Sequence, residues 1–382
     1  MTTGPVLPYG RQSIDERDID AAVSALKSDW LTTGPEVDRF EAAVATRAGV
    51  PHAVSVTSGT AALHVAYAAT GIGPGDEVVT TPLTFVATAA AAALLGATVV
   101  FADVDPATGN LDPAAAEAAV TERTRVVTGV DYAGVPVDTQ AFRDLADRKG
   151  LLFVEDAAHS IGSRQGGRPV GSLADLTTFS FFPTKNLTTA EGGAVVTADD
   201  ALAARARSFK NHGLVRDRSA QRYPDEGPWH QEVHAFGLNY RLPDVLAAVG
   251  TSQLARLDDF VARRAQVKAA YDEAFRDLDD VELPAQPSEA DPAWHLYPLR
   301  VPAARRRAIF EALRAQGIGV QVNYIPAYWH PVFEDLGYQR GQCPVAEDYY
   351  RREISLPMFP GLTDADVERV VEATRHALST VR

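Results

Sequence analysis

The segments Phe153-Val154-Glu155-Asp156-Ala157-Ala158-His159-Ser160 and Ser180-Phe181-Phe182-Pro183-Thr184-Lys185 decide the fold of this chain. In each segment an apolar, strand-like run delivers a polar group at or just beyond its end: Asp156 in the first and Lys185 in the second. A strand-end carboxylate and a lone lysine are what pyridoxal phosphate (PLP) chemistry needs. The carboxylate keeps the pyridine nitrogen protonated, and the lysine forms a Schiff base and moves protons. The two segments therefore predict a PLP site on an α/β sheet.

The composition excludes several classes of protein. The chain has 382 residues, which is long enough for a large core and for two domains. A net charge of −14 argues against nucleic-acid binding, which depends on basic surface. Cys343 is the only cysteine, so an internal disulfide and a thiolate metal cluster are excluded, and we expect no metal site.

Neither a secretory signal nor a membrane span is expected. The first ten residues lack a basic segment followed by an apolar core. The most apolar stretch, residues 86–101, is interrupted by Gly96 and is too short to cross a bilayer. We therefore expect a soluble, cytoplasmic protein that binds neither membranes nor nucleic acid.

Apolar strand-like runs alternate with helical segments through the first two thirds of the chain. The expected strands are residues 54–57, 77–81, 98–104, 125–130, 151–155, 176–181 and 194–197, with helices at 61–69 and about 85–95. Runs this apolar are buried on both faces, and the helices between them imply crossovers and a mainly parallel sheet. Ligands of such sheets bind at the carboxyl ends of the strands, where Ser58, Asp156 and residues 180–185 fall.

The last third predicts a smaller α+β unit. A long helical pattern runs from residue 242 to residue 275, and a proline-containing stretch follows. Strands are then expected at 296–301 and 320–324, and helices at 304–316 and 364–378. We place the domain boundary near residue 250. Residues 1–250 are expected to form a large cofactor-binding domain, and residues 251–382 a small C-terminal domain.

Each polar group also has a purely structural explanation. Ser58-Gly59-Thr60 caps a helix as readily as it binds a phosphate, and Asp156 at a strand end is often a helix cap. His159 alone is more often a hydrogen-bonded structural residue, and Lys185 alone a solvated one. The order of the motifs favours the cofactor interpretation, because apolar neighbours lower the pKa of a lysine and Schiff-base formation needs the neutral amine. A non-PLP α/β domain, in which every motif is a cap or a turn, is the alternative.

Together these motifs resemble the DegT/DnrJ/EryC1/StrS family of sugar aminotransferases, a branch of the aspartate-aminotransferase-like (fold type I) PLP enzymes. The likeness covers nearly the whole chain. Besides the segments above, it includes residues 84–88, Asn211-His212-Gly213 and Asn239-Tyr240-Arg241-Leu242. Residues 130–134, 188–193, 295–298 and 353–357 also resemble one subgroup, the UDP-4-amino-4,6-dideoxy-N-acetyl-altrosamine transaminases of the pseudaminic acid route.

The resemblance implies a role for each matching residue. Lys185 corresponds to the Schiff-base lysine, and Asp156 to the partner of the pyridinium nitrogen. His159 lies in the loop beside the cofactor hydroxyl, where it also faces the substrate, so we count it with the catalytic residues. The other expected cofactor contacts are a ring against the cofactor face (Phe85), phosphate ligands (Gly59, Thr60 and Ser180), and a contact to the cofactor phosphate of the other subunit (Asn239). This last contact implies a homodimer with shared active sites.

The implied reaction is transamination. Relatives that replace the lysine with histidine catalyse dehydration, whereas this chain keeps Lys185. By this resemblance the amino donor is L-glutamate, which would leave pyridoxamine phosphate. That form would then aminate the 4-keto group of a nucleotide-linked 6-deoxyhexose. Lys185 would carry the proton. The alternatives are a dTDP-keto-sugar aminotransferase of natural-product biosynthesis, a PLP-dependent sugar dehydratase, and a non-catalytic PLP-binding regulator.

The substrate residues are the least determined by sequence. The subgroup places residues 30–34, which include Thr32, near the sugar. On the small domain Asn323, Tyr324 and His330 are candidates, and Arg216 and Arg241 are candidate partners of a diphosphate. Ordinary surface or packing explains each of them equally well. A cleft between the two domains is the expected place for such a ligand.

Overall fold

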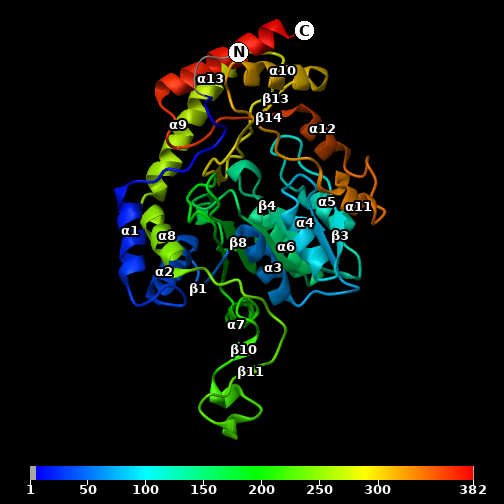
Figure 1. The fold of residues 1–382 in the computed structure, drawn as a ribbon. Helices are drawn as coiled ribbons and strands as arrows, with labels where there is room; N and C mark the ends of the chain where they lie inside the picture. Colours follow the sequence, from blue (N-terminus) through cyan, green and yellow to red (C-terminus); the bar gives the residue numbers. More distant parts are fainter. Residues whose placement is uncertain (1–5, 382) are drawn as a thin grey trace.

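The computed structural model describes residues 6–381 and has a seven-stranded sheet at its centre (Figure 1). The strand order is β1-β9-β8-β5-β4-β2-β3. The strands are β1 (His52–Val56), β2 (Glu77–Thr80), β3 (Thr98–Phe101), β4 (Thr124–Val130), β5 (Leu152–Asp156), β8 (Leu176–Ser180) and β9 (Gly193–Thr197). In this sheet β9 runs antiparallel to both of its neighbours, and the remaining pairs are parallel. The predicted α/β fold with a mainly parallel sheet is confirmed.

Helices cover both faces of the sheet, because successive strand residues point to opposite sides. Val78 and Val126 pack in one hydrophobic cluster with α3 and α4, whereas Val79 and Val127 pack in another with α5 and α6. The helices of this part are α3 (Gly59–Thr70), α4 (Ala87–Leu94), α5 (Pro113–Ala119), α6 (Thr139–Lys149) and α7 (Asp200–Phe209). The period of two along each strand thus accounts for the layered architecture.

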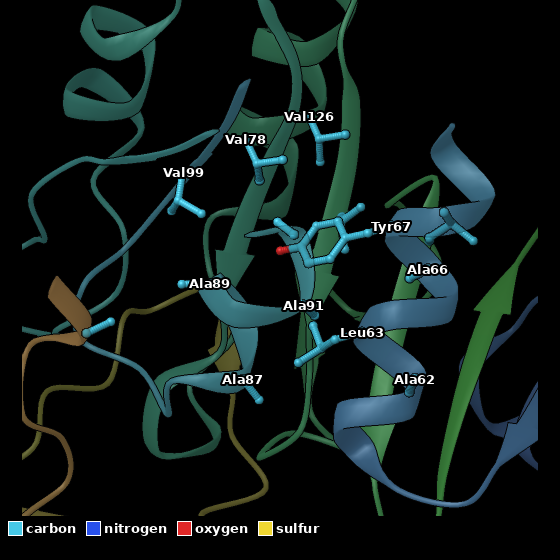
Figure 2. Packing of buried hydrophobic residues seen from close by; sticks show 14 of the residues in the cluster. Ala62, Leu63, Ala66, Tyr67, Val78, Ala87, Ala89, Ala91, Val99 and Val126 are labelled. Atoms are coloured by element: carbon cyan, nitrogen blue, oxygen red, sulfur yellow. The ribbon is translucent and has the colours of Figure 1, made fainter. Parts of the chain in front are cut away.

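Small side chains bring α3 and α4 close to the sheet. Figure 2 shows Ala62 and Ala66 of α3 and the alanines of α4 beside the valines of the central strands. Tyr67 is the largest side chain at this point. Its buried hydroxyl donates to the carbonyl of Thr88 (3.1 Å) and bonds with Oγ1 of Thr128 (3.0 Å). The polar atom is therefore satisfied inside an apolar layer.

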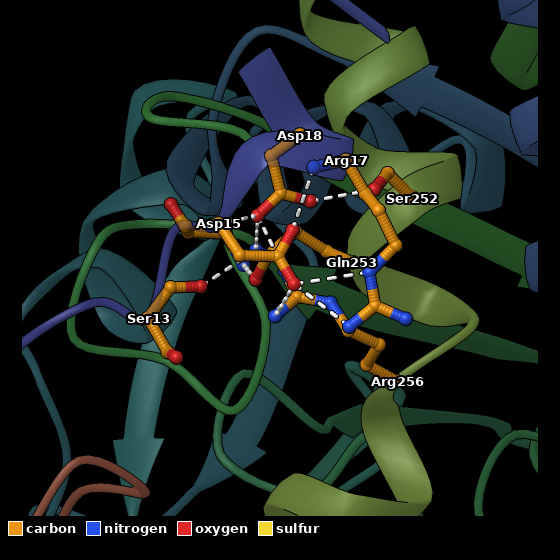
Figure 3. Close-up of polar contacts among 8 residues, drawn as sticks. Ser13, Asp15, Arg17, Asp18, Ser252, Gln253 and Arg256 are labelled. Atoms are coloured by element: carbon orange, nitrogen blue, oxygen red, sulfur yellow. Dashed lines mark hydrogen bonds and ion pairs between the residues drawn. The ribbon is translucent and has the colours of Figure 1, made fainter. Parts of the chain in front are cut away.

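Two N-terminal helices, which the sequence patterns did not predict, pack on α8. They are α1 (Glu16–Lys27) and α2 (Pro35–Ala48), and α8 spans Asp244–Leu254. Their junction is polar: the buried carboxylate of Asp18 accepts from Ser252 Oγ (2.6 Å) and Gln253 Nε2 (2.6 Å) and pairs with Arg256 (Figure 3). Asp18 also closes the capping box of α1.

The long helix predicted over residues 242–275 is wrong in one respect, since it is two helices. After α8 the chain leaves helical geometry at Arg256 (φ −111°, ψ 5°), and α9 spans Leu257–Phe275. The Arg256 guanidinium is turned to α1, where it pairs with Asp18 and with Asp15 (2.9 Å). The residue at the break therefore forms ion pairs with residues far away in the sequence, and the local periodicity of apolar residues does not reveal such a break.

The C-terminal unit has its own core. The antiparallel strands β13 (Tyr297–Arg300) and β14 (Glu353–Leu356) pack with α9 and with the surrounding helices. The helices of this core are α10 (Ala303–Ala315) and α13 (Asp364–Thr380), whereas α11 (Pro331–Glu334) and α12 (Pro344–Arg352) pack in the cluster that contains α3 and α4. Along α9, Leu257 packs in a cluster of the large part and Val267 in that of the small part. The boundary near residue 250 stays a prediction.

The strand predicted at residues 320–324 is wrong. Only one isolated bridge forms there, between Gln321 and Ser355. Side chains take the backbone groups that a strand would have used: Glu353 accepts from the N–H of Asn323 (2.7 Å), and the Tyr132 hydroxyl donates to its carbonyl (2.5 Å). These tertiary contacts replace the ladder of a third strand.

A long arm, residues 211–239, projects from the body (Figure 1). A bridge between Asn211 and Asn239 closes its base, and a hairpin of β10 (Leu214–Val215) and β11 (Glu232–Val233) lies within it. Large apolar side chains of the arm are exposed, and Phe236 is 98% exposed. A two-stranded hairpin with such a surface is not stable alone, so the arm has the character of an interface.

Short elements complete the fold. They are the strands β6 (Arg164–Gln165), β7 (Arg168–Pro169) and β12 (Ala290–Asp291), and the 3-10 turns at Tyr132–Gly134, Arg218–Ala220, Pro224–Glu226 and Ala327–Trp329. Over residues 6–381, every helix is too short or too polar to cross a membrane.

We predict that Asp18→Ala lowers the free energy of unfolding by about 3–5 kcal/mol, because it leaves the buried Arg256 without its closest carboxylate. Urea denaturation of the purified variant measures this loss. Arg17→Ala is the matched control, since Arg17 pairs with Asp15 on the surface, where solvent screens the pair and its contribution to stability is small. Equal losses for the two variants would contradict a special role of the buried network.

Candidate active site

A cavity of about 750 Å³ lies at the carboxyl ends of the central strands. Val130, Asp156 and Ser180, the last residues of β4, β5 and β8, line it together with Gly59 at the start of α3. This is the edge at which a parallel sheet is expected to bind its ligand. The remaining lining residues are Tyr9, Ser58, Thr60, Leu63, Thr84, Phe85, Ala87, Thr88, Ala158, His159, Phe182, Thr184, Lys185, Glu191, His295, Gln321, Val322, Asn323 and Tyr324.

Lys185 lies on the loop after β8, with its side chain in the wall of this cavity. Burial lowers the pKa of Lys185 to about 8, and the carboxylate of Asp156 opposes this shift. A lysine with a lowered pKa has a larger neutral fraction near pH 7, and the neutral amine is the nucleophile for a carbonyl. The environment therefore suits Schiff-base formation.

Asp156 ends β5 on the same cavity and is buried. Its carboxylate accepts from Thr88 Oγ1 (2.6 Å) and from the N–H of Ala158 (3.2 Å). Burial raises the pKa of Asp156, whereas these two hydrogen bonds and the charge of Lys185 lower it. A cationic N–H donor would stabilise the ionised carboxylate, which is the interaction that a protonated pyridine nitrogen offers.

The start of α3 forms an anion cradle. Ser58 accepts from the N–H of Ala61 (3.0 Å) and caps the helix, so the interpretation of Ser58 as a helix cap is correct. A Cβ on Gly59 would lie 2.7 Å from Cβ of Ser180, so only glycine allows these two segments to approach this closely. Free N–H groups of the first turn and the hydroxyls of Thr60 and Ser180 then suit a phosphate.

His159 sits beside the lysine, between two other aromatic side chains. Its Nε2 lies 3.0 Å from the Tyr324 hydroxyl, and its ring centroid lies 4.4 Å from that of His295. Burial, with the charge of Lys185 adding to it, places the pKa of His159 well below the usual range. Its Nδ1 is buried without a hydrogen-bond partner among residues 6–381. His159 is therefore a neutral imidazole, and its ring lies in the lining of the cavity.

Phe85 also lines the cavity, with 57% of its surface exposed, and its ring meets the edge of Tyr324 (centroids 6.1 Å apart). Such an exposed ring at a cavity mouth fits a stacking role, which remains a prediction. Of the residues predicted to bind substrate, Tyr324 and its neighbour Asn323 line the cavity.

Five predicted residues lie outside the lining of the cavity. Thr32 bridges Pro243, Arg241 bonds to Oδ1 of Asn211 (2.7 Å), and His330 precedes α11. Arg216 follows β10 in the arm, and Asn239 is exposed at the base of the arm. Within one chain none of them contacts the cavity, so their roles stay predictions, and for Asn239 the prediction concerns another subunit.

The structure adds residues that motif reasoning did not assign. Thr88 lies in residues 84–88, which carry the resemblance, but its hydrogen bond to Asp156 is evident only from the tertiary structure. His295 lies in residues 295–298, which also carry the resemblance, and its ring lies tilted by 43° against that of His159. Tyr9 reaches the cavity from the N-terminal segment and accepts from Asn323 Nδ2 (3.3 Å), a contact that no local pattern signals.

The residues fit PLP. A lysine with a lowered pKa, a buried carboxylate that forms no direct ion pair among residues 6–381, and a glycine-dependent anion cradle all face one cavity. This donor set defines the class: a fold type I PLP enzyme.

Comparison with known proteins agrees. The model of the DegT/DnrJ/EryC1/StrS aminotransferase family matches residues 12–375, and the chain belongs to this family. The spore coat polysaccharide biosynthesis protein SpsC of Bacillus subtilis is 41% identical, over 97% of this chain and 96% of SpsC.

Solved structures extend the comparison. PseC of Helicobacter pylori, an aminotransferase involved in the biosynthesis of pseudaminic acid, is 31% identical with a TM-score of 0.91, over 98% of this chain and 100% of PseC. Spr1654 of Streptococcus pneumoniae, a putative sugar aminotransferase solved with PLP and with pyridoxamine phosphate (PMP), is 28% identical with a TM-score of 0.92. The match to its PLP form extends over 99% of this chain and 100% of Spr1654. This protein is a PLP-dependent sugar aminotransferase.

Buried Glu353 supports the wall of the cavity that Asn323 and Tyr324 form. Burial raises the pKa of Glu353 to about 8, although hydrogen bonds from Ser355 and Asn323 oppose this. In the folded state the carboxyl is therefore protonated at pH values where it is ionised in the unfolded chain. Its contribution to stability is complete below the unfolded pKa and is lost as the pH rises toward 8.

We accordingly predict that Glu353→Gln flattens the pH dependence of stability between pH 5 and pH 8, because glutamine cannot ionise. Urea denaturation at several pH values measures the slope. Glu311→Gln is the control, since Glu311 is an exposed partner of Arg307 on α10, and it should keep the wild-type slope. A wild-type slope in Glu353→Gln would show that this carboxyl does not titrate as proposed.

Proposed function

We propose that this enzyme transfers an amino group from L-glutamate to the 4-keto group of a nucleotide-linked 6-deoxyhexose. The observation that carries the proposal is the arrangement of Lys185 and Asp156 in one cavity, in a chain similar to PseC over nearly its full length. Both PseC and SpsC are named for roles in the biosynthesis of sugar-containing products, which supports an amino sugar as the product.

PLP supplies an electron sink for the carbanion at the reacting carbon. Lys185 would hold the cofactor covalently and, when free, would remove and return a proton. Its lowered pKa suits both tasks, because protonated and neutral forms are both accessible near neutral pH. Asp156 would pair with the protonated ring nitrogen, and Thr88 donates to this carboxylate and orients it.

The cavity of one chain lacks the cations that a nucleotide diphosphate needs. Lys185 is the single Lys or Arg among its lining residues, and the acidic groups Asp156 and Glu191 line it as well. The arm carries Arg216, Arg218 and Arg222 away from the body, beside its exposed apolar side chains. An arm that enters the cavity of a second copy would supply both charge and apolar cover.

We therefore propose a homodimer whose active sites are shared. Asn239, exposed at the base of the arm, is the residue assigned to the cofactor phosphate of the partner. Phe85 and Phe182, which line the cavity and are half exposed, form the rim that the partner would cover.

The first experiment is an absorbance spectrum of the protein with PLP. We expect a visible band from the Lys185-linked cofactor, which L-glutamate shifts to the pyridoxamine form and a keto sugar restores.

Lys185→Ala should lack the band and the activity, because no other lysine lines the cavity. Asp156→Asn should bind the cofactor but react roughly 10²-fold more slowly. UDP- and dTDP-linked keto sugars, compared at equal concentration, identify the nucleotide. Turnover in Lys185→Ala would refute the assignment.

The shared site predicts complementation between two inactive variants. Asn239→Asp would place a negative charge against the partner's phosphate, whereas Lys185→Ala removes the reacting amine. A mixed dimer has one cavity with both native residues, so an equal mixture after subunit exchange should recover about a quarter of wild-type activity. No recovery, in a mixture shown to contain mixed dimers, would mean that Asn239 acts in its own subunit or not at all.

A further inference from the structure

Arg264, in the middle of α9, is fully buried and donates only to backbone carbonyls. Its Nη1 lies 2.9 Å from the oxygen of Met358, 3.2 Å from that of His295 and 3.3 Å from that of Trp294. Its Nη2 lies 3.4 Å from the carbonyl oxygen of Lys185. In the part of the chain that the structure describes, no carboxylate pairs with it.

A buried guanidinium without a carboxylate is costly, because it loses its hydration and gains only dipoles in exchange. An apolar side chain at this position of α9 would avoid that cost. The carbonyls that Arg264 gathers belong to three separate segments: the Lys185 loop, the entry to β13 and the exit from β14. The side chain therefore joins the reactive loop of the large part to one end of the small sheet, where β13 begins and β14 ends.

A second side chain joins two of the same segments. Asn186 donates from Nδ2 to the carbonyl of Ala293 (2.6 Å) and to that of His159 (3.3 Å). Lys185 and Asn186 are thus tied on both sides to residues 293–295, and His295 of that stretch lines the cavity. These bonds leave the backbone of Lys185 little freedom relative to the cavity wall.

We propose that Arg264 is a positioning residue: its forked guanidinium fixes the backbone of Lys185 against the segment that carries His295, and so sets where the lysine amine meets the cofactor. This inference rests on the proposed role of Lys185. Arginine suits the task because its planar fork presents several donors in fixed directions, which lysine does not.

The charge of Arg264 acts in the same direction. Burial places the pKa of His295 well below the usual range, and the charges of Lys185 and Arg264 lower it further. His295 therefore stays neutral beside Lys185, and it does not compete with the amine for a proton. Burial is the main cause, and the Arg264 cation adds to it.

The test compares Arg264→Met and Arg264→Lys with the control Arg263→Met. Arg263 is the preceding residue of α9 and also donates to a backbone carbonyl, that of Leu362 (2.6 Å), but it lies on the surface beside Asp364. For each variant we would measure thermal unfolding, the affinity of the apoprotein for PLP by fluorescence quenching, and the rate at which the visible band of the Lys185-linked cofactor appears.

We expect both Arg264 variants to form the band at least about tenfold more slowly than Arg263→Met, with PLP affinity changed much less, since a misplaced nucleophile slows the reaction more than the binding. With L-glutamate, the maximal rate of band loss should fall while KM stays within about threefold. If Arg264→Met does not fold, Arg264→Lys decides the question.

Variants of Arg264 that are less heat-stable but form the band as fast as Arg263→Met would overturn the proposal and leave a structural role only. A wild-type protein that forms no band with PLP would instead overturn the role of Lys185 itself. The two failures are therefore distinguishable.

Discussion

The opposite charges of Asp156 and Lys185, which line one cavity, are the interaction on which the site depends. Burial raises the pKa of the acid and lowers that of the amine, and each charge opposes the shift of the other. Neither group is fully compensated by the protein alone. A ligand that offers a ring N–H to the acid and a carbonyl to the amine satisfies both, which is why this pair fits PLP.

The sheet delivers this pair because of where its strands end. β5 and β8 are parallel neighbours, so Asp156 and the Lys185 loop emerge at the same edge. Side chains from elsewhere then fix the two groups: Thr88 orients the carboxylate, while Arg264 and Asn186 hold the backbone beside the lysine. Buried polar groups thus build the site, and hydrogen bonds satisfy most of them.

The arm and the cavity are complementary in composition. The cavity of one chain has few cations and an exposed aromatic rim, whereas the arm carries arginines and exposed apolar side chains. The apolar side chains of the arm would leave water if a second copy of the chain covered them, which would explain why a hairpin without a core carries them. The two features therefore support the proposed homodimer, in which the arm of one copy completes the cavity of the other.

The sequence by itself determined the layered α/β core and the reactive pair, because both depend on local patterns. Apolar runs with a period of two predict the strands, and Asp156 and Lys185 are identified by the strands they follow. Only the tertiary structure decided the break at Arg256, the loss of a strand at residues 320–324, and the wall made by Tyr9, Thr88 and His295. Each of these depends on contacts between residues far apart in the chain, whose hydrogen bonds outweigh the local preference of the backbone.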